Sequence, residues 1–308
     1  MRPSALRRPS TLTALVATAA AAAAVAVLTS RRAAIRRHSA MLDGRAGLGA
    51  DGVVAGAESI DLLRDDDGGD RAVLILHGFG DTPQSVAPLA TYLHAAGWTV
   101  RAPLLPGHGR TLREFGNSSA ADWLECAGEE MAALQATHRR VVLIGQSMGG
   151  ALATILAAAS PPPALVLLAP YLDMPPEVRR LARLQKLWSF ALPYVDSGGE
   201  ESIVDETERA ASLAYGAVNG RVLRQLLHLV EQARAAYPRV RSPLLVAQSR
   251  RDNRITESVT RRAFARFGST RKRLVWLDEG GHVLAVDRGR ERLFALVKAW
   301  LDETVPSS

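Results

Sequence analysis

The sequence predicts an α/β fold, with a mainly parallel central sheet flanked by helices and a helical cap insertion. Three observations lead to this prediction. Short apolar runs rich in Val, Ile and Leu recur along the chain, as expected for strands that are buried on both faces. Segments with helical periodicity separate these runs, and such alternation is typical of parallel sheets with right-handed crossovers. Residues 171–237 have a helical pattern only and interrupt the alternation once.

The composition is that of a globular chain, and its charge is concentrated at one end. Of 308 residues, 47% are hydrophobic and 22% are charged, which is close to the average for soluble domains. The formal net charge is +7, and residues 1–40 contain seven arginines and no acid. Residues 41–308 are therefore formally neutral. A nucleic-acid-binding domain needs a basic face of its own, so nucleic acid is not an expected partner.

Residues 1–40 are expected to direct the chain to a membrane. Residues 9–30 carry no charge, and 22 residues at about 1.5 Å per residue can cross a hydrocarbon core of about 30 Å. The segment is either an uncleaved membrane anchor or a signal peptide that is cleaved on export; a disordered Ala/Arg-rich tail is a third alternative. Arginines flank the run on both sides, so the topology is left open. Residues 41–57 are expected to be a linker.

The first part of the core is expected over residues 58–170. Residues 72–76 form an apolar run that ends near Gly78, which predicts a buried strand. Residues 82–96 show helical periodicity and stop at Gly97. The same reasoning predicts further strands at 98–102, 141–144 and 165–169, and further helices at 119–137 and 148–159.

The second part of the core is expected over residues 238–304, after the insertion. Within residues 171–237 the amphipathic stretches 176–190, 206–215 and 219–236 predict a cap built from helices, with no clear strand. Alternation then resumes, and it predicts strands at 244–248 and 273–277 and helices at 256–267 and 288–303.

A candidate nucleophile lies between the strand 141–144 and the helix that follows it. Residues 145–149 read G-x-S-x-G, with Ser147 at the centre. In this strand–turn–helix setting a serine occupies a sharp, strained turn that exposes its hydroxyl. The pattern by itself is common, but its position directly after a buried strand makes Ser147 the candidate.

A serine hydroxyl needs a base, and the base needs an acid that orients it. His282 follows the strand 273–277 and is the candidate base, because sites form at the carboxyl ends of parallel strands. Asp252 follows the strand 244–248 and is the preferred acid, in the chain order Ser, Asp, His. Asp278 and Asp173 are the rival acids, since each also follows a predicted strand.

The negative charge that develops during acyl transfer needs two backbone N–H donors. Met148, the residue after the candidate nucleophile, supplies one from the start of a helix. Phe79, in the loop after the strand 72–76, is the candidate for the other, and His77 is interpreted as a residue that holds this loop. Gly78 and Gly80 do not begin a dinucleotide-binding fingerprint, because no third glycine follows at the required spacing.

These motifs together resemble those of the α/β-hydrolase superfamily, and within it the bacterial carboxylesterase and monoacylglycerol lipase group. The resemblance covers about residues 70–302. It rests on residues 74–79, 82–83, 89–90, 105–109, Trp123, residues 145–150 and the loops of Asp252 and His282.

The resemblance implies a serine hydrolase that cleaves carboxylic esters through an acyl-enzyme, with Ser147, Asp252 and His282 catalytic and Phe79 and Met148 forming the oxyanion hole. It implies no metal and no cofactor. The implied substrate is a small-molecule ester or a lipid-like ester, bound beneath the apolar cap.

Two other interpretations remain open. The same residues could perform acyl transfer, peptide hydrolysis or cofactor-free haloperoxidase chemistry. Alternatively the chain could be a membrane-tethered binding protein without catalysis, although a binding protein has no need of the serine, the aspartate and the histidine together. Serine at position 147 argues against haloalkane dehalogenases and epoxide hydrolases, which resemble this fold but carry aspartate there.

Overall fold

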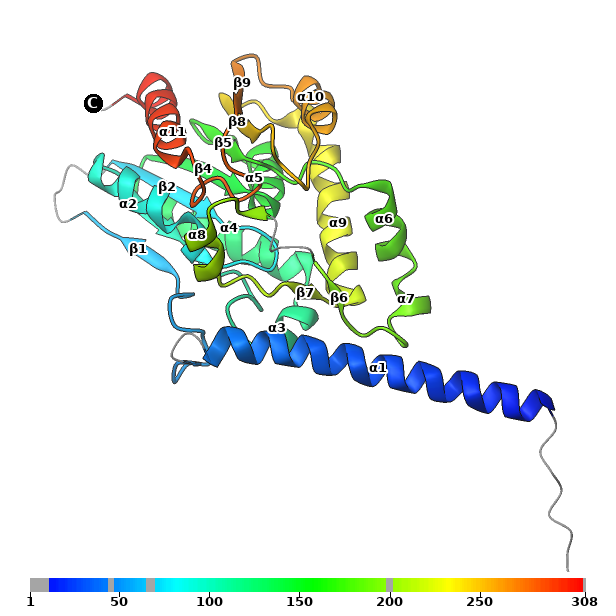
Figure 1. The fold of residues 1–308 in the computed structure, drawn as a ribbon. Coiled ribbons are helices and arrows are strands. Elements are labelled where there is room, and N and C mark those ends of the chain that lie inside the picture. Colours follow the sequence, from blue (N-terminus) through cyan, green and yellow to red (C-terminus); the bar gives the residue numbers. More distant parts are fainter. Residues whose placement is uncertain (1–10, 44–46, 65–69, 198–201, 307–308) are drawn as a thin grey trace, which may run out of the picture.

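A seven-stranded sheet forms the centre of the protein (Figure 1). The computed structural model describes residues 11–43, 47–64, 70–197 and 202–306. The strands are ordered β1-β3-β2-β4-β5-β8-β9, and all neighbours are parallel except β1 and β3. Their bounds are β1 (Ile60–Leu62), β2 (Arg71–Leu76), β3 (Thr99–Ala102), β4 (Arg140–Gln146), β5 (Leu165–Leu168), β8 (Leu244–Ser249) and β9 (Lys272–Leu277). The predicted mainly parallel sheet is thus confirmed.

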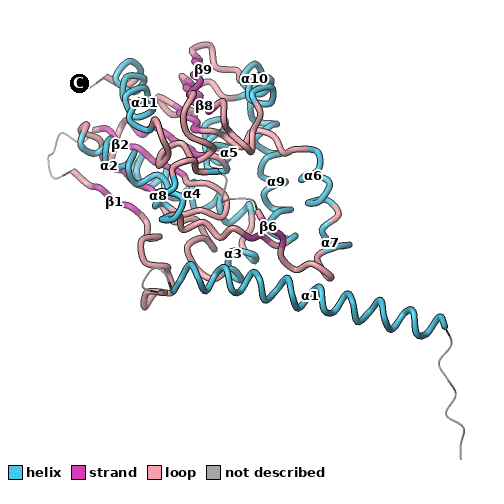
Figure 2. Tube along the Cα trace, in the orientation of Figure 1, coloured by secondary structure: helices cyan, strands magenta, loops and turns pink. Residues whose placement is uncertain are grey.

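Helices cover both faces of the sheet (Figure 2). On one face lie α2 (Ala87–Ala95), which follows the short turn η1 (Pro83–Val86), and α11 (Arg290–Thr304). On the other lie α4 (Ala120–Thr137), α5 (Met148–Ala159), α9 (Gly220–Ala236) and α10 (Glu257–Arg266). Each predicted core helix is present within a few residues of its expected bounds. The structure adds α3 (Leu112–Asn117), which is too short to give a helical period in the sequence.

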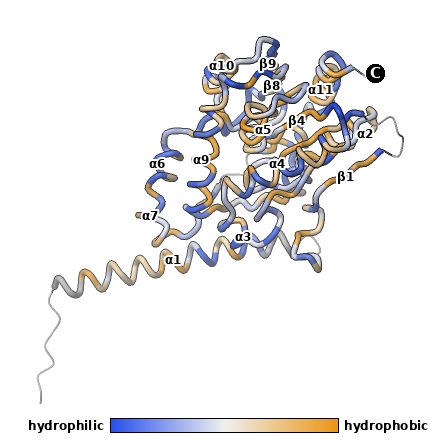
Figure 3. The backbone as a smooth tube through the Cα atoms, turned by 180° about the vertical axis from the view of Figure 1, so that it is seen from behind, coloured by the Kyte–Doolittle hydropathy of each residue, from blue (hydrophilic) through white to orange (hydrophobic). Residues whose placement is uncertain are grey.

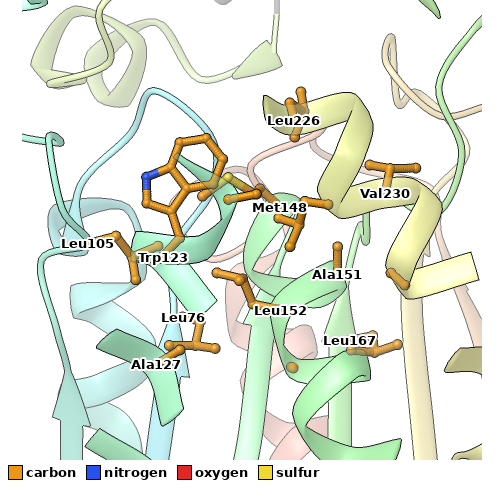
Figure 4. Close-up of a cluster of buried hydrophobic side chains, with 14 of the residues drawn as sticks. Leu76, Leu105, Trp123, Ala127, Met148, Ala151, Leu152, Leu167, Leu226 and Val230 are labelled. Carbon is orange, nitrogen blue, oxygen red and sulfur yellow. The ribbon is translucent and has the colours of Figure 1, made fainter. Parts of the chain in front are cut away.

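The two apolar layers follow from the alternation of side chains along the central strands. In β2, Val73 and Ile75 point to the layer that contains α2 and α11. Leu74 and Leu76 point to the opposite layer, where Leu152 of α5 packs. Figure 4 shows this second layer, in which residues from the sheet meet residues of α4, α5 and α9. Because both faces of each central strand are buried, the strands read as continuous apolar runs in the sequence.

The cap differs in detail from the helical insertion that the sequence predicts. The stretch 176–190 divides into α6 (Pro176–Arg183) and α7 (Gln185–Trp188), and α8 (Glu206–Ala211) is shorter than expected. The expectation of no strand is wrong, since β6 (Val195–Asp196) pairs antiparallel with β7 (Ala217–Val218). A two-residue strand is too short to show a period of two, so only the pairing of distant segments reveals it.

The segment before the sheet is also more ordered than a linker. Val53, Val54 and Ala57 are buried in a small cluster with Leu213 of the cap. The antiparallel strand β1 follows and pairs with β3 at the sheet edge. Residues 47–57 therefore pack on the domain, although their composition is that of a linker.

The two halves of the N-terminal helix α1 (Thr11–Asp43) differ in hydropathy and in their position relative to the domain (Figure 3). Its first half extends away from the domain, and its second half lies along the cap. Among the described residues it is the one helix long and apolar enough to cross a membrane, and an N-terminal signal sequence would satisfy the same criterion. The anchor and the cleaved signal are thus both compatible with the helix, whereas the third alternative, a disordered tail, is wrong for residues 11–43.

The packing of α5 on the sheet yields a stability prediction. Leu152 is fully buried between α5 and the strands, so Leu152→Ala should lower the free energy of unfolding by about 2–5 kcal/mol. Leu63 is 65% exposed, and Leu63→Ala should change it by less than about 0.5 kcal/mol. Urea denaturation of the parent and both variants, under identical buffer conditions, measures the two changes in the free energy of unfolding. Equal losses for the two variants would contradict this account of the core.

Candidate active site

Ser147 occupies a strained backbone position between β4 and α5. Its φ of 53° and ψ of −116° lie outside the regions that non-glycine residues prefer, which costs of order 1–3 kcal/mol. Hydrogen bonds hold the turn: its N–H donates to the Leu168 carbonyl at 3.0 Å, and its carbonyl accepts from the N–H groups of Gly150 and Tyr171, each at 3.0 Å. The tight turn presents the hydroxyl at the carboxyl edge of the sheet.

The flanking glycines allow α5 to approach the sheet closely. A side-chain carbon at Gly149 would overlap the carbonyl oxygen of Leu76 in β2. One at Gly145 would overlap the carbonyl of Gly149 itself. Larger residues would push the start of α5 away from β2, and Ser147 would move with it.

Ser147, His282 and Asp252 form one hydrogen-bonded chain across the ends of β4, β8 and β9. His282 Nε2 lies 2.7 Å from Ser147 Oγ, and His282 Nδ1 lies 2.8 Å from Asp252 Oδ2. An ionised carboxylate only accepts, so Nδ1 carries the imidazole proton and Nε2 accepts from the serine hydroxyl. The His282 and Asp252 side chains are almost completely buried. The structure therefore brings together the three residues that the sequence proposes.

The environment of Asp252 favours its ionised form. Burial by itself raises the pKa of this carboxyl, but the charge and hydrogen bond of His282 and the backbone N–H groups of Ile255 and Arg254 outweigh burial. The net effect is a pKa below the usual range. The two N–H groups donate to Oδ1 at 2.9 and 2.7 Å, and Oδ2 accepts from the imidazole and from the Gln248 side-chain amide.

The two rival acids are engaged elsewhere. Asp173 pairs with Arg179 of α6 and, at 2.9 Å, with Arg234 of α9. Asp278 is largely exposed and pairs with Arg250 at 3.1 Å. Neither has a hydrogen bond to His282, whereas Asp252 does.

Two backbone N–H groups are available beside Ser147. Met148 is the first residue of α5, and the first N–H groups of a helix have no intrahelical partner. In the described part of the chain, Phe79 N–H donates no backbone hydrogen bond. The buried His77 holds this loop, because its Nδ1–H donates to the Gly78 carbonyl at 2.9 Å and its Nε2 accepts from Leu105 N–H at 3.1 Å. Burial lowers the pKa of His77 to about 4, so it remains neutral.

Sequence reasoning missed the residues that fix the loop of His282. The buried Asp287 carboxylate accepts from Gly281 N–H at 2.6 Å and from the N–H groups of Val204 and Asp205 in the cap, both at 2.9 Å. His282 N–H in turn donates to the Ser202 carbonyl at 2.8 Å. No spacing rule links these segments in the sequence. The loop that carries the imidazole is thus bonded directly to the cap.

The arginines around Asp252 have different environments. Arg250 lies on the surface and pairs with Glu257 and Asp278. Arg254 instead lines the cavity above Ser147, and its Nε–H donates to Ser202 Oγ at 3.0 Å. One cation of the group therefore lies within the site, and it connects the loop of Asp252 to the cap.

A cavity of about 430 Å³ lies between the sheet and the cap, directly above Ser147. Ser147, His282 and Phe79 form its floor. Its walls are mostly apolar and come from α6, β6, β7 and α9: Val178, Leu181, Val195, Val218, Leu223 and Leu226. This volume is within the range of pockets that enclose small organic ligands.

The geometry defines the class of protein, and comparisons with known proteins identify the family. Residues 69–289 match the family described as serine aminopeptidase S33. The chain belongs to this family of serine hydrolases, and its fold is the α/β-hydrolase fold.

Characterised relatives act on esters. The chain is 28% identical to a carboxylesterase of Bacillus subtilis (strain 168) over 77% of its own length and 94% of the relative. It is 30% identical to a thermostable monoacylglycerol lipase of Bacillus sp. (strain H-257) over 71% of its length and 85% of the relative. A solved structure from work on the metagenome-derived lipolytic enzymes LipS and LipT superimposes with a TM-score of 0.73 and 30% identity, over 82% of this chain and 99% of that one.

The buried carboxyl of Asp81 at the cavity wall gives a pH-dependent prediction. Burial raises its pKa to about 6, although Ser85 and the Thr82 N–H hydrogen-bond to it. A carboxyl whose pKa is raised on folding stabilises the protein below its unfolded pKa and loses that contribution as the pH passes 6. Asp81→Asn should therefore gain up to about 3 kcal/mol over the parent at pH 7.5 and almost nothing at pH 4.

Chemical denaturation of the Asp81→Asn variant and the parent at both pH values measures this difference. All other titrating groups are common to the two proteins, so the contributions of groups that do not interact with Asp81 cancel, and the interaction of Asp81 with His282 is included in the measured difference. A difference that does not change between pH 4 and pH 7.5 would refute the assignment to Asp81.

Proposed function

We propose that this protein hydrolyses carboxylic esters by covalent catalysis, with Ser147 as nucleophile, His282 as general base and acid, and Asp252 as the orienting acid. One observation carries the proposal: in a hydrogen-bonded Ser–His–Asp chain, the serine and the histidine line a mostly apolar cavity. Each contact in that chain supports a separate step of the reaction.

In the first step Ser147 Oγ attacks the ester carbonyl while His282 Nε2 takes the hydroxyl proton. The imidazole becomes positive, and the ionised Asp252 carboxylate stabilises that charge through Nδ1–H. Because Asp252 retains its negative charge at neutral pH, the base is ready without a prior protonation change.

The negative charge on the tetrahedral carbonyl oxygen is stabilised by the N–H groups of Met148 and Phe79. His282 then gives its proton to the leaving alkoxide, and the acyl group remains on Ser147. A water molecule, activated by the same imidazole, hydrolyses the acyl-enzyme and restores the serine. All these groups are fixed by backbone contacts, so little reorganisation is needed.

The cavity favours an ester with an apolar acyl chain. The walls offer Val and Leu side chains, which suit a hydrocarbon better than the charged amino terminus of a peptide. The names of the two bacterial relatives, a carboxylesterase and a monoacylglycerol lipase, agree with this substrate class. Arg254 is the one cationic lining residue among those described around the cavity, and it lies on the side of Ser202.

The ester proposal is tested with p-nitrophenyl esters of increasing acyl length. Each methylene buried in the cavity should contribute about 0.8 kcal/mol, so kcat/KM should rise about fourfold per methylene from acetate until the cavity is filled. Ser147→Ala should lose at least about 10⁴-fold in kcat and all labelling by a fluorophosphonate. Asp252→Asn should lose about 10⁴-fold, because the imidazole then takes the wrong tautomer.

Asp278→Asn is the matched control for Asp252→Asn, since Asp278 is the rival carboxylate that does not reach the imidazole. It should keep near-parental activity. No hydrolysis of any ester by the parent, together with no labelling of Ser147, would refute the hydrolase proposal.

We further propose that α1 is an uncleaved membrane anchor. Its second half belongs to the folded domain, because Ala34 is buried in the main core and Ser30 and Arg37 hydrogen-bond to the cap. A signal peptidase cut within this half would remove part of the domain's packing. The first half is left for the bilayer.

The anchor proposal predicts that the full-length protein stays with membranes after alkaline carbonate extraction. Replacing Ala20 and Ala21 together by arginine should release it, since each central arginine costs about 2.5–3.5 kcal/mol of insertion free energy. Ile35→Arg, beyond the uncharged run, is the control and should remain bound. A shortened mature chain found in the medium would instead indicate a cleaved signal.

A further inference from the structure

We propose that the outer face of α6 and α7, residues 176–192, lies against the bilayer in which α1 is anchored and contacts anionic lipid headgroups. This cap face orients the cavity towards the membrane. The inference rests on the anchor proposed above and goes beyond it, because an anchored domain could present any of its sides to the lipid.

The cap face exposes large apolar side chains. Leu187 is 78% exposed and Phe190 is 85% exposed. Three further leucines of the face are partly exposed: Leu181, Leu184 and Leu192. Such a cluster of exposed apolar side chains is uncommon on a surface that faces water, and it is typical of surfaces that contact a membrane or another protein.

The same face is basic. It contains four basic residues and one acid, Glu177. Arg179 and Arg183 already pair with acids of neighbouring segments, whereas Arg180 and Lys186 have no ion pair with a described residue. Apolar side chains beside cations are the pattern of helices that lie in the interface of an anionic membrane. The charge of the face is thus complementary to anionic headgroups.

Contacts between α1 and the cap fix how the anchor and the cap face lie relative to each other. Ser30 Oγ donates to the Tyr194 carbonyl at 2.8 Å, and Arg37 pairs with Asp196 at 2.8 Å. Ala34, between them, is 4% exposed. The segment just after the cap face is therefore held beside the point where the uncharged run of α1 ends.

This arrangement places α7 at the depth of the apolar part of α1. Along the axis of α1, α7 lies beyond β6 in the direction of the extending N-terminal half (Figure 1). If Ser30 marks the membrane boundary, α7 lies on the lipid side of that boundary. Interfacial helices insert about 5–10 Å below the headgroups, which is one to two turns of α1.

The cap face is also a wall of the cavity. Val178 and Leu181 of α6 line the cavity, and Leu181 is in addition 37% exposed on the outside. Only the thickness of one short helix separates the cavity from the proposed lipid surface. An ester dissolved in the bilayer would thus meet the cap face before it meets bulk water.

The placement is tested with a fluorescent reporter on the full chain. In a Cys126→Ala background, which removes the single cysteine, Leu187→Cys is labelled with a polarity-sensitive dye. After reconstitution into vesicles with one-third phosphatidylglycerol, its emission should shift to the blue and be quenched by lipid-borne spin labels. Glu291→Cys, on the 81% exposed Glu291 side chain at the start of α11, is the control and should show neither effect.

A functional test uses the double variant Leu187→Ser with Phe190→Ser, at two positions that do not line the cavity. Hydrolysis of a soluble butyrate ester should be unchanged. Hydrolysis of a monoacylglycerol embedded in the same vesicles should fall at least fivefold. Leu63→Ser, which removes an exposed leucine elsewhere, should leave both rates unchanged.

The outcomes separate this inference from the proposals on which it rests. Loss of the protein on carbonate extraction refutes the anchor, and absence of ester hydrolysis refutes the function. Carbonate-resistant protein whose label at position 187 remains in water overturns the cap-face inference alone. Equal shifts in purely zwitterionic vesicles would overturn the part assigned to anionic headgroups.

Discussion

The site depends on the close packing of α5 against β2, which the glycines at positions 145 and 149 permit. This contact sets the strained turn at Ser147 and aims the first N–H of α5 at the space above the serine. It also brings the loop after β2 within reach, so both proposed oxyanion donors result from a single packing constraint. The hydrogen bonds from Leu168, Gly150 and Tyr171 hold the strain in place.

The cap covers the cavity above Ser147, and hydrogen bonds also connect it to the loops of His282 and Asp252. The loop of His282 is bonded to the cap through the Ser202 carbonyl and the Asp287 carboxylate. Arg254 links the loop of Asp252 to Ser202. A displacement of the cap would therefore reach both the base and the acid.

The N-terminal basicity lies in residues 1–40, far along the chain from Ser147, Asp252 and His282. The arginines that account for the formal charge of +7 flank the uncharged run of α1. Arg37 and Ser30 attach this helix to the cap, which also forms the cavity walls. The proposed anchor is thus attached to the segment that encloses the cavity.

The sequence by itself determined the central strands, the core helices and the pairing of Ser147 with His282, because these depend on local apolar runs and on the order of motifs. Tertiary structure decided what depends on contacts between distant segments. It distinguished Asp252, the acid that the sequence already preferred, from Asp173 and Asp278, because of these three carboxylates only that of Asp252 hydrogen-bonds to the imidazole. It likewise revealed the β6–β7 pair and the role of Asp287, for which no sequence period exists.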